Sequence, residues 1–469
     1  MNLRALALFA LLVWLTRAPL APAHLFYFDS VNYALALDEF NPARHQPQPP
    51  GSPFYVFLCR ALRLAAGSAE QTFLLSGVLA GAIAMWLLLL VAKRVSTPAA
   101  GWMAALLLLA HPVFWLATLT NQARTFLAVA SAGVALLALR AAARDASAAW
   151  LYAAGLFAGV MGGFRAEAPV LLVPLLLWAA WRRAARFFDY AVLAAMAAAP
   201  TLLWLGIAVE AAGGVRAYLD LLRAYSQDQF TASSPLFGAS WRQSWRMIEV
   251  ALVFNFLGVL AWLWVLIKGR AALPEPRWFF AAWFVPAFLF QCTVHVYDPD
   301  HALLTVPVLC LLGGHLLAAA FEGRKARIAA AAVACAVSAG LFFHPLRGAA
   351  RPLSYHVVRR VEAAVAEAFA AIREARRAGP VTVILGQTLV TWRHLTYYFP
   401  EVEVWTMQNW SPSGAARPSA EAGRVYVALD RAVTVSRTPP AGFPPVPAAS
   451  HSAPPASSGP DPPSPDARR

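Results

Sequence analysis

The chain has 469 residues, of which 59% are hydrophobic and only 13% are charged. An ordinary soluble domain carries about 25% charged residues, so this composition indicates an integral membrane protein and excludes a large soluble helical core. The net charge of +14 does not predict nucleic-acid binding. The arginines stand in short clusters between apolar runs, which is the arrangement that orients a membrane protein.

The apolar runs predict about eleven membrane spans, each near the roughly 20 residues that a helix needs to cross the hydrocarbon. Basic clusters fall on every second connection. Under the positive-inside rule this predicts that the clusters and the N-terminus lie on the inside, the cytoplasmic side of the cytoplasmic (inner) membrane. The spans are expected at residues 3–20, 71–92, 98–118, 122–140, 147–164, 167–181, 187–210, 247–267, 278–295, 301–320 and 327–345. The clusters are Lys93-Arg94, Arg140/Arg144, Arg182-Arg183/Arg186, Lys268/Arg270 and Arg324-Lys325/Arg327.

The first span has two interpretations. Its basic start, short apolar region and Ala-x-Ala ending at Ala23 are also typical of a cleavable signal peptide. In both interpretations residues 21–66 form an external loop. The run at 53–66 is predicted to lie in the membrane interface, with Arg60 and Arg63 on its polar side, because a crossing there would move all the basic clusters outside.

Two further parts of the chain are predicted to lie outside. The loop at 211–246 is rich in aromatic and polar residues; it could cover a site or contact an acceptor, although a plain surface connection is the preferred interpretation. Residues 347–437 are predicted to form a small α/β domain, because a helical pattern at 354–379 is followed by alternating strand and helix patterns. Residues 438–469 are rich in proline, serine and alanine, which predicts a disordered tail.

The first group of candidate site residues lies in the first loop. Asp29, with Tyr33 four residues later, directly follows the first span, and Asp38 comes further on. A carboxylate at the mouth of a water-filled cavity can accept a proton from an attacking hydroxyl; a solvated loop charge is the alternative. In RHQPQPPGSPFY (44–55) closely spaced prolines force an extended path and a turn and carry His45, which could instead be incidental to a stiff loop.

These residues resemble a known family. An acid and a tyrosine after the first span, followed by His-x-Pro-x-Pro-Pro-Gly-x-Pro-x-Tyr at 45–55, are similar to the first external loop of the GT-C glycosyltransferases. The protein O-mannosyltransferases and the aminoarabinose transferases of lipid A are the branches most similar. The resemblance covers about residues 1–346 and implies a multi-span fold that uses the acid of this loop to transfer sugar, with inversion, from a polyprenyl-phosphate donor outside the membrane.

The resemblance also implies roles for single residues. Asp29 would be the catalytic base, and Asp38 or Glu39 would replace the second acid that related branches carry where this chain has Ser30. His295 and His301, in HVYDPDHALLTVP (295–307), would fill the place of a basic group or tyrosine in relatives. The residues expected to bind the donor are Tyr33, His45, Arg124, Arg165 and His301.

Arg124 and Arg165 are predicted at the external ends of spans. An intramembrane arginine normally faces a polar cavity, and a guanidinium can bind a phosphate through paired hydrogen bonds. The alternatives are snorkelling to the interface and, for Arg165, an ion pair with Glu167.

Two other classes of function stay open: a lipid-linked saccharide transporter or flippase, and a non-catalytic membrane assembly protein. The sequence contains no nucleotide-binding fingerprint and no HExxH motif. It predicts no certain cofactor and leaves a divalent metal open. The expected partners are the bilayer, a polyprenyl-phosphate-linked sugar, and an acceptor that is a protein, a lipid or a glycan.

Overall fold

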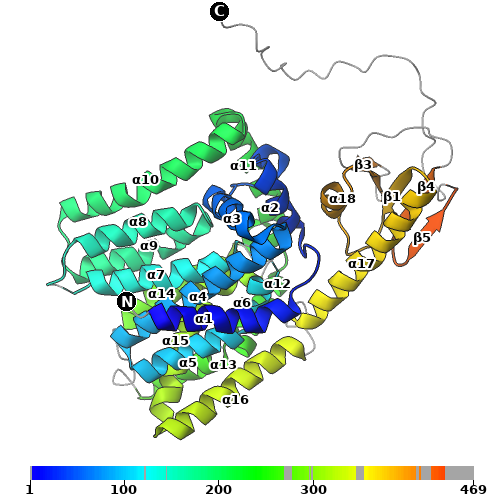
Figure 1. Cartoon of the computed structure of the whole chain (residues 1–469). Coiled ribbons are helices and arrows are strands. Elements are labelled where there is room, and N and C mark those ends of the chain that lie inside the picture. Colours follow the sequence, from blue (N-terminus) through cyan, green and yellow to red (C-terminus); the bar gives the residue numbers. More distant parts are fainter. Residues whose placement is uncertain are drawn as a thin grey trace, which may run out of the picture. The chain divides into compact units, whose positions relative to one another are not determined.

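A computed structural model describes residues 3–120, 123–143, 145–268, 277–294, 296, 299–344, 353–407, 411–413 and 424–438. The chain divides into two compact units, Met1–Ala366 and Glu367–Arg469. The first is helical, and the second contains a small sheet (Figure 1). This confirms the predicted fold class of a helical protein with a small C-terminal α/β unit. The predicted domain limits stay predictions, and nearly all of the predicted tail lies outside the described residues.

The helices of the first unit follow one another with short connections. In chain order they are α1 (Leu3–Arg17), α2 (Phe28–Asp38), α3 (Pro53–Ala66), α4 (Ala69–Val95), α5 (Pro98–Ala110), α6 (Pro112–Leu119), α7 (Thr125–Ala141), α8 (Ala149–Gly162), α9 (Glu167–Arg182), α10 (Phe187–Ala211), α11 (Val215–Ser233), α12 (Trp241–Phe254), α13 (Phe256–Lys268), α14 (Arg277–Thr293), α15 (Val306–Ala320) and α16 (Arg324–Phe343), and α17 (Tyr355–Ala378) begins in this unit.

Several of these helices are long and apolar enough to cross a membrane. Among the described residues they are Leu3–Leu20, α4, α10 and α16, and the bent pair α5 and α6 makes a fifth candidate. The shorter apolar helices α7, α8 and α15 fall below that length. The structure therefore supports several crossings, while the count of about eleven stays a prediction.

The bend between α5 and α6 is stabilised by a buried arginine. The two helices meet at 59°, where Pro112 cannot donate a backbone hydrogen bond. Arg17, at the end of α1, is fully buried and donates to the Leu109 carbonyl at 2.7 Å and to the Thr118 hydroxyl at 2.9 Å. A carbonyl freed by a helix break is costly in an apolar surrounding, so these bonds fix the break in place.

Glycines set the distance between α8 and α10, which lie side by side (Figure 1). A Cβ on Gly155 would lie 2.7 Å from the Leu193 carbonyl oxygen, and one on Gly159 would collide with the carbonyl of Ala197. Small residues spaced by four let two helix backbones approach closely. Since α8 leads directly into the turn that carries Arg165, this contact also positions one wall of the site described below.

We expect Gly159→Ala to lower the melting temperature of the purified protein in detergent. The added methyl must push α8 away from α10, and overpacking of this kind costs about 1–3 kcal/mol. Gly206→Ala on α10 is the matched control, because a Cβ there meets nothing within 4 Å. There the loss of glycine flexibility should leave stability equal or slightly higher. Equal melting temperatures for both variants would contradict the close contact.

The second unit is a five-stranded sheet in the order β3-β2-β1-β4-β5. β1 (Val381–Leu385) is central and pairs in parallel with β2 (Glu403–Thr406) and β4 (Val425–Leu429). The edge strands β3 (Ser411–Ser413) and β5 (Val433–Ser436) are antiparallel, and α18 (Trp392–Tyr398) connects β1 to β2. The strand and helix patterns read from the sequence are therefore found. β1 is buried along its whole length, as its continuous apolar pattern indicates.

Candidate active site

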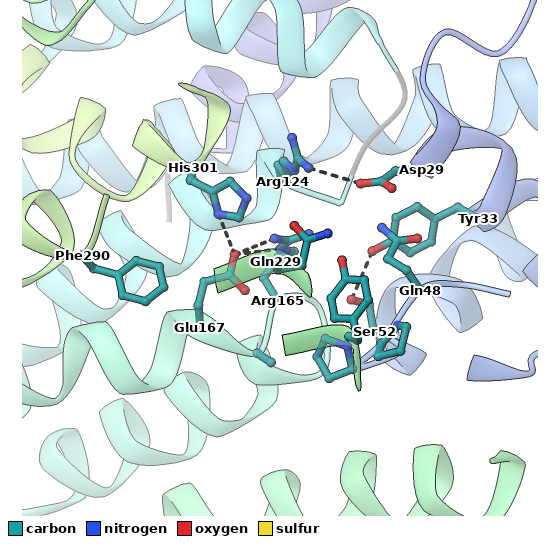
Figure 2. A pocket seen from close by; sticks show the side chains of 14 residues that line it. Asp29, Tyr33, Gln48, Ser52, Arg124, Arg165, Glu167, Gln229, Phe290 and His301 are labelled. Carbon is teal, nitrogen blue, oxygen red and sulfur yellow. Dashed lines mark hydrogen bonds and ion pairs between the residues drawn. The ribbon is translucent and has the colours of Figure 1, made fainter. Parts of the chain in front are cut away.

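Residues of the first loop meet distant parts of the chain around a cavity of about 280 Å³ (Figure 2). The walls come from α2, the proline segment, the starts of α7 and α9, α11, α14 and the 3-10 helix η5 (Pro299–Leu304). The lining residues are Asp29, Tyr33, Gln48, Pro49, Pro50, Ser52, Arg124, Arg165, Ala166, Glu167, Tyr225, Gln229, Phe290 and His301.

Asp29 forms an ion pair with Arg124 on one wall of the cavity. Asp29 lies in the first turn of α2, where the helix dipole favours a negative charge. Arg124 directly precedes α7, and its Nη2 donates to Asp29 Oδ2 at 3.2 Å. The Asp29 side chain is 27% exposed and that of Arg124 only 8%. The carboxylate therefore faces the open side while the arginine is held behind it.

Ser30 follows Asp29 in α2. It is fully buried, and its hydroxyl donates to the Thr120 carbonyl at 3.0 Å. This bond ties α2 to the end of α6. Ser30 therefore helps to hold in place the helix that carries Asp29, and it is not among the residues that line the cavity.

Arg165, Glu167 and His301 form a second charged group. Arg165 Nε and Nη2 both donate to Glu167 Oε1, at 3.0 Å and 2.7 Å. His301 Nδ1 lies 3.2 Å from the same oxygen. The ion pair with Glu167, which was the alternative interpretation of Arg165, is therefore present, and it lies in the cavity wall. Because one carboxylate oxygen serves three nitrogens, Glu167 fixes the positions of both cationic side chains.

The proline segment returns across α2 and brings its own polar groups to the cavity. Asn41 and Gln46 exchange backbone hydrogen bonds of 2.6 Å and 2.9 Å that close the preceding turn. Tyr33 then donates to the Ser52 hydroxyl at 3.2 Å. Burial raises the pKa of Tyr33, so its hydroxyl stays neutral. Gln48 lies near Asn32, with the amide atoms 3.4 Å apart.

His45 does not line the cavity. Its ring lies edge-on to the ring of Tyr225, a lining residue, with 6.0 Å between the centroids. Burial raises the pKa of Tyr225 to about 12, so this hydroxyl is a neutral donor as well. His45 therefore supports a lining residue. His295 lies outside the described residues.

Asp38 is also placed away from the cavity. It ends α2, is exposed, and pairs with Arg63 of α3 at 2.7 Å. Arg60, one turn earlier on α3, donates to the carbonyls of Ala36 and Leu37. Both arginines of α3 thus bind the C-terminal end of α2. The structure does not bring Asp38 to Asp29 as a second carboxylate.

The segment after residue 211 differs from the preferred interpretation as a plain connection. It forms α11, a short 3-10 turn and α12, and α11 supplies Tyr225 and Gln229 to the cavity. Tyr218, on the same face of the helix, donates to the Pro50 carbonyl at 3.0 Å. The positions 218, 225 and 229 recur at helical spacing, and this periodicity is the signal that could have identified the wall.

No group of three histidine, cysteine, aspartate or glutamate side chains that could hold a metal ion occurs among the described residues. Within that part of the chain, each of the two cavity carboxylates is instead paired with an arginine.

This chain is similar to a known protein family and to solved structures. Residues 47–204 match the family model of dolichyl-phosphate-mannose-protein mannosyltransferases. The structure is similar to that of ArnT from Cupriavidus metallidurans bound to undecaprenyl phosphate, with a TM-score of 0.57 and 18% identity over 87% of this chain and 86% of that one. The chain has the GT-C fold. The apo state of the same ArnT matches this GT-C chain with a TM-score of 0.55 and 16% identity over 86% and 84% of the two chains.

The resemblance to the GT-C superfamily is therefore confirmed, and so is the multi-pass membrane architecture. The matched segment 47–204 contains part of the proline segment together with Arg124 and Arg165. No curated protein sequence matches the chain.

Proposed function

We propose that this GT-C protein transfers a sugar from a polyprenyl-phosphate donor to an acceptor hydroxyl on the extracytoplasmic face, with inversion. The observation that carries the proposal is that a partly exposed carboxylate, Asp29, and two arginines, Arg124 and Arg165, line one cavity. Glycosyl transfer from a lipid phosphate needs both kinds of group: a proton acceptor for the attacking hydroxyl and cations for the departing phosphate.

Asp29 is the better base of the two cavity carboxylates. Glu167 is the more enclosed, and one of its oxygens already serves Arg165 and His301. Asp29 contacts Arg124 at 3.2 Å and has the larger exposed fraction. An opposite charge at this distance favours the ionised carboxylate, which is the form that accepts a proton. Glu167 is assigned the role of holding the cations.

Arg165 is the residue best placed to bind the donor phosphate. Its Nε and Nη2 are used by Glu167, while its Nη1 makes no hydrogen bond within the part of the chain that the structure describes. A guanidinium can therefore stay fixed to Glu167 and still donate to a phosphate oxygen. ArnT, a protein of similar fold, binds undecaprenyl phosphate, which supports a lipid phosphate as the ligand.

The reaction then proceeds in one displacement. The acceptor hydroxyl gives its proton to Asp29 as its oxygen attacks the anomeric carbon. The bond from that carbon to the phosphate oxygen breaks on the opposite face, and polyprenyl phosphate leaves. Arg124, Arg165 and His301 offset the negative charge that develops on the phosphate.

Purified protein in lipid nanodiscs tests this function when it is supplied with a radiolabelled polyprenyl-phosphate hexose and a membrane extract that provides acceptors. We expect loss of label from the lipid donor together with release of polyprenyl phosphate that no longer carries a sugar. In sealed vesicles, movement of intact donor between the leaflets without loss of its sugar would support a flippase instead. An intact donor pool that neither moves nor turns over would favour the non-catalytic assembly protein.

We further propose that the N-terminus lies on the cytoplasmic side of the inner membrane and that the first loop, α11 and the C-terminal unit lie on the opposite side. The acceptor, whether protein, lipid or glycan, would then approach from that side. The alternation of basic clusters along the sequence supports this orientation.

Cysteine labelling provides the test of orientation. We expect Gln227→Cys, on the exposed side of α11, to react with a membrane-impermeant thiol reagent in spheroplasts, and Ala143→Cys to react only after permeabilisation. Both positions are exposed. The native cysteines give little background, because Cys59, Cys292 and Cys310 are buried and Cys335 is half-buried. The reverse labelling pattern would overturn the orientation.

A further inference from the structure

Among the side chains that the structure describes, the charges lining the cavity are already paired. Asp29 faces Arg124, and Glu167 faces Arg165 and His301. The other hydrogen-bonding side chains that line the described part of the cavity are uncharged, and all are amides or hydroxyls: Tyr33, Gln48, Ser52, Tyr225 and Gln229.

This inventory limits the charge of the sugar. An ammonium group would need a carboxylate, and recruiting Asp29 would draw it away from its ion pair with Arg124, whose side chain is only 8% exposed. Weakening a partly buried ion pair in this way is unfavourable. A carboxylate on the sugar would add a second negative charge beside the phosphate, where the two arginines are already shared with Asp29 and Glu167. An uncharged sugar incurs neither cost.

We propose that the donor carries an uncharged, hydroxyl-rich sugar, and that Gln48, Gln229 and Tyr225 recognise its hydroxyl groups. This inference rests on the proposed function and narrows its substrate to neutral sugars, as distinct from amino sugars and uronic acids. Amide side chains both donate and accept hydrogen bonds, and a sugar hydroxyl does the same, so the pairing satisfies both partners.

The recognising residues come from two independent elements. Gln48 belongs to the proline segment, whereas Tyr225 and Gln229 belong to α11, and all line the cavity that holds Asp29 and Arg165 (Figure 2). The bond from Tyr218 to the Pro50 carbonyl, at 3.0 Å, ties these two elements together. A sugar between them is therefore bound by groups whose relative positions are already fixed, which reduces the entropic cost of binding.

Equilibrium binding to the full-length protein in nanodiscs tests the inference. The probes are a short polyprenyl phosphate without sugar and the same lipid carrying glucose, 4-amino-4-deoxyarabinose or glucuronic acid. We expect the glucose lipid to bind at least about tenfold tighter than both charged-sugar lipids, because each of these brings an uncompensated charge into the cavity. Equal or tighter binding of either charged-sugar lipid would overturn the inference and leave the glycosyltransferase proposal standing. If none of the four lipids binds, the proposed function itself fails.

Gln229→Glu supplies the missing carboxylate and should shift the preference. We expect this variant to bind the glucose lipid more weakly and the amino-sugar lipid more tightly than the parent does. Gln227→Glu is the matched control: it makes the same chemical change two residues away on α11, where the side chain is exposed, and should leave all affinities unchanged. Equal behaviour of the two variants would remove Gln229 from sugar recognition.

Discussion

Asn in place of Asp29 is expected to leave a protein that inserts and purifies like the parent but transfers sugar about 10²–10⁴ times more slowly. Asparagine is nearly isosteric with aspartate but cannot accept a proton as a carboxylate does. The loss corresponds to about 3–5 kcal/mol in the activation barrier. The measurement is turnover of a polyprenyl-phosphate hexose by the purified variant, beside its melting temperature.

A structural role for Asp29 makes a different prediction about donor binding. The substitution frees Arg124 from its 3.2 Å contact, so the variant should bind the lipid phosphate as tightly as the parent or more tightly, while its turnover falls. If Asp29 only held Arg124 in place, donor affinity and turnover would fall together. Turnover above about a third of the parental rate would remove Asp29 from catalysis.

Asp38→Asn is the matched control for this experiment. It removes a carboxylate from the same helix, but from an exposed pair with Arg63. Changes of that kind usually alter stability by no more than about 0.5 kcal/mol, and turnover should stay close to the parental rate.

The contrast between these two acids shows what the sequence can predict. Residues 28 to 38 form one helix, and successive residues in a helix turn by about 100°. Tyr33, four residues after Asp29, returns to nearly the same face, and both line the cavity. Asp38, nine residues after Asp29, falls on the opposite face. The sequence pattern placed all three residues in the loop after the first span, but predicting which of them face the cavity requires that residues 28 to 38 be recognised as a helix.

The structure likewise brings some of the predicted cationic residues to the cavity and leaves another outside it. Arg124, Arg165 and His301 come together because each stands at the end of an apolar segment, and segment ends at one depth converge in a helical bundle. His45 is also polar, but it contacts Tyr225 and is not among the residues that line the cavity. The turn that places His45 is closed by backbone hydrogen bonds between Asn41 and Gln46. The residue types at these positions do not predict those bonds.

Gln48, Ser52 and Gln229 could not be assigned from the sequence for another reason. Each is a neutral polar residue of a common type, and it gains a role only through contact with a distant segment. Gln229 lines the cavity because Tyr218 fixes α11 to the proline segment, about 170 residues earlier in the chain. Long-range packing of this kind depends on the whole bundle, which local patterns do not encode.

The second large effect is expected at Arg165. Arg165→Lys should weaken binding of the lipid phosphate about 10- to 100-fold, because a single charge-assisted hydrogen bond contributes roughly 1.5–3 kcal/mol. The guanidinium keeps Nε and Nη2 on Glu167 and offers Nη1 to the phosphate, whereas one ammonium cannot serve both partners in that geometry. Arg165→Ala should bind the lipid more weakly still. Arg223→Ala, in an exposed pair with Asp220 on α11, is the control and should bind it normally.

A double variant separates phosphate binding from charge compensation. Removing Arg165 leaves Glu167 with His301 alone among its described ionic partners, so the single alanine variant could fail because an exposed carboxylate repels the donor phosphate. Arg165→Ala combined with Glu167→Gln removes that repulsion. If Arg165 binds the phosphate, the double variant should stay at least about tenfold weaker than the parent in donor affinity, since no guanidinium remains to donate from that wall. Recovery of parental affinity in the double variant would show that Arg165 serves only to neutralise Glu167. Unchanged affinity in the single alanine variant would return Arg165 to a purely structural ion pair.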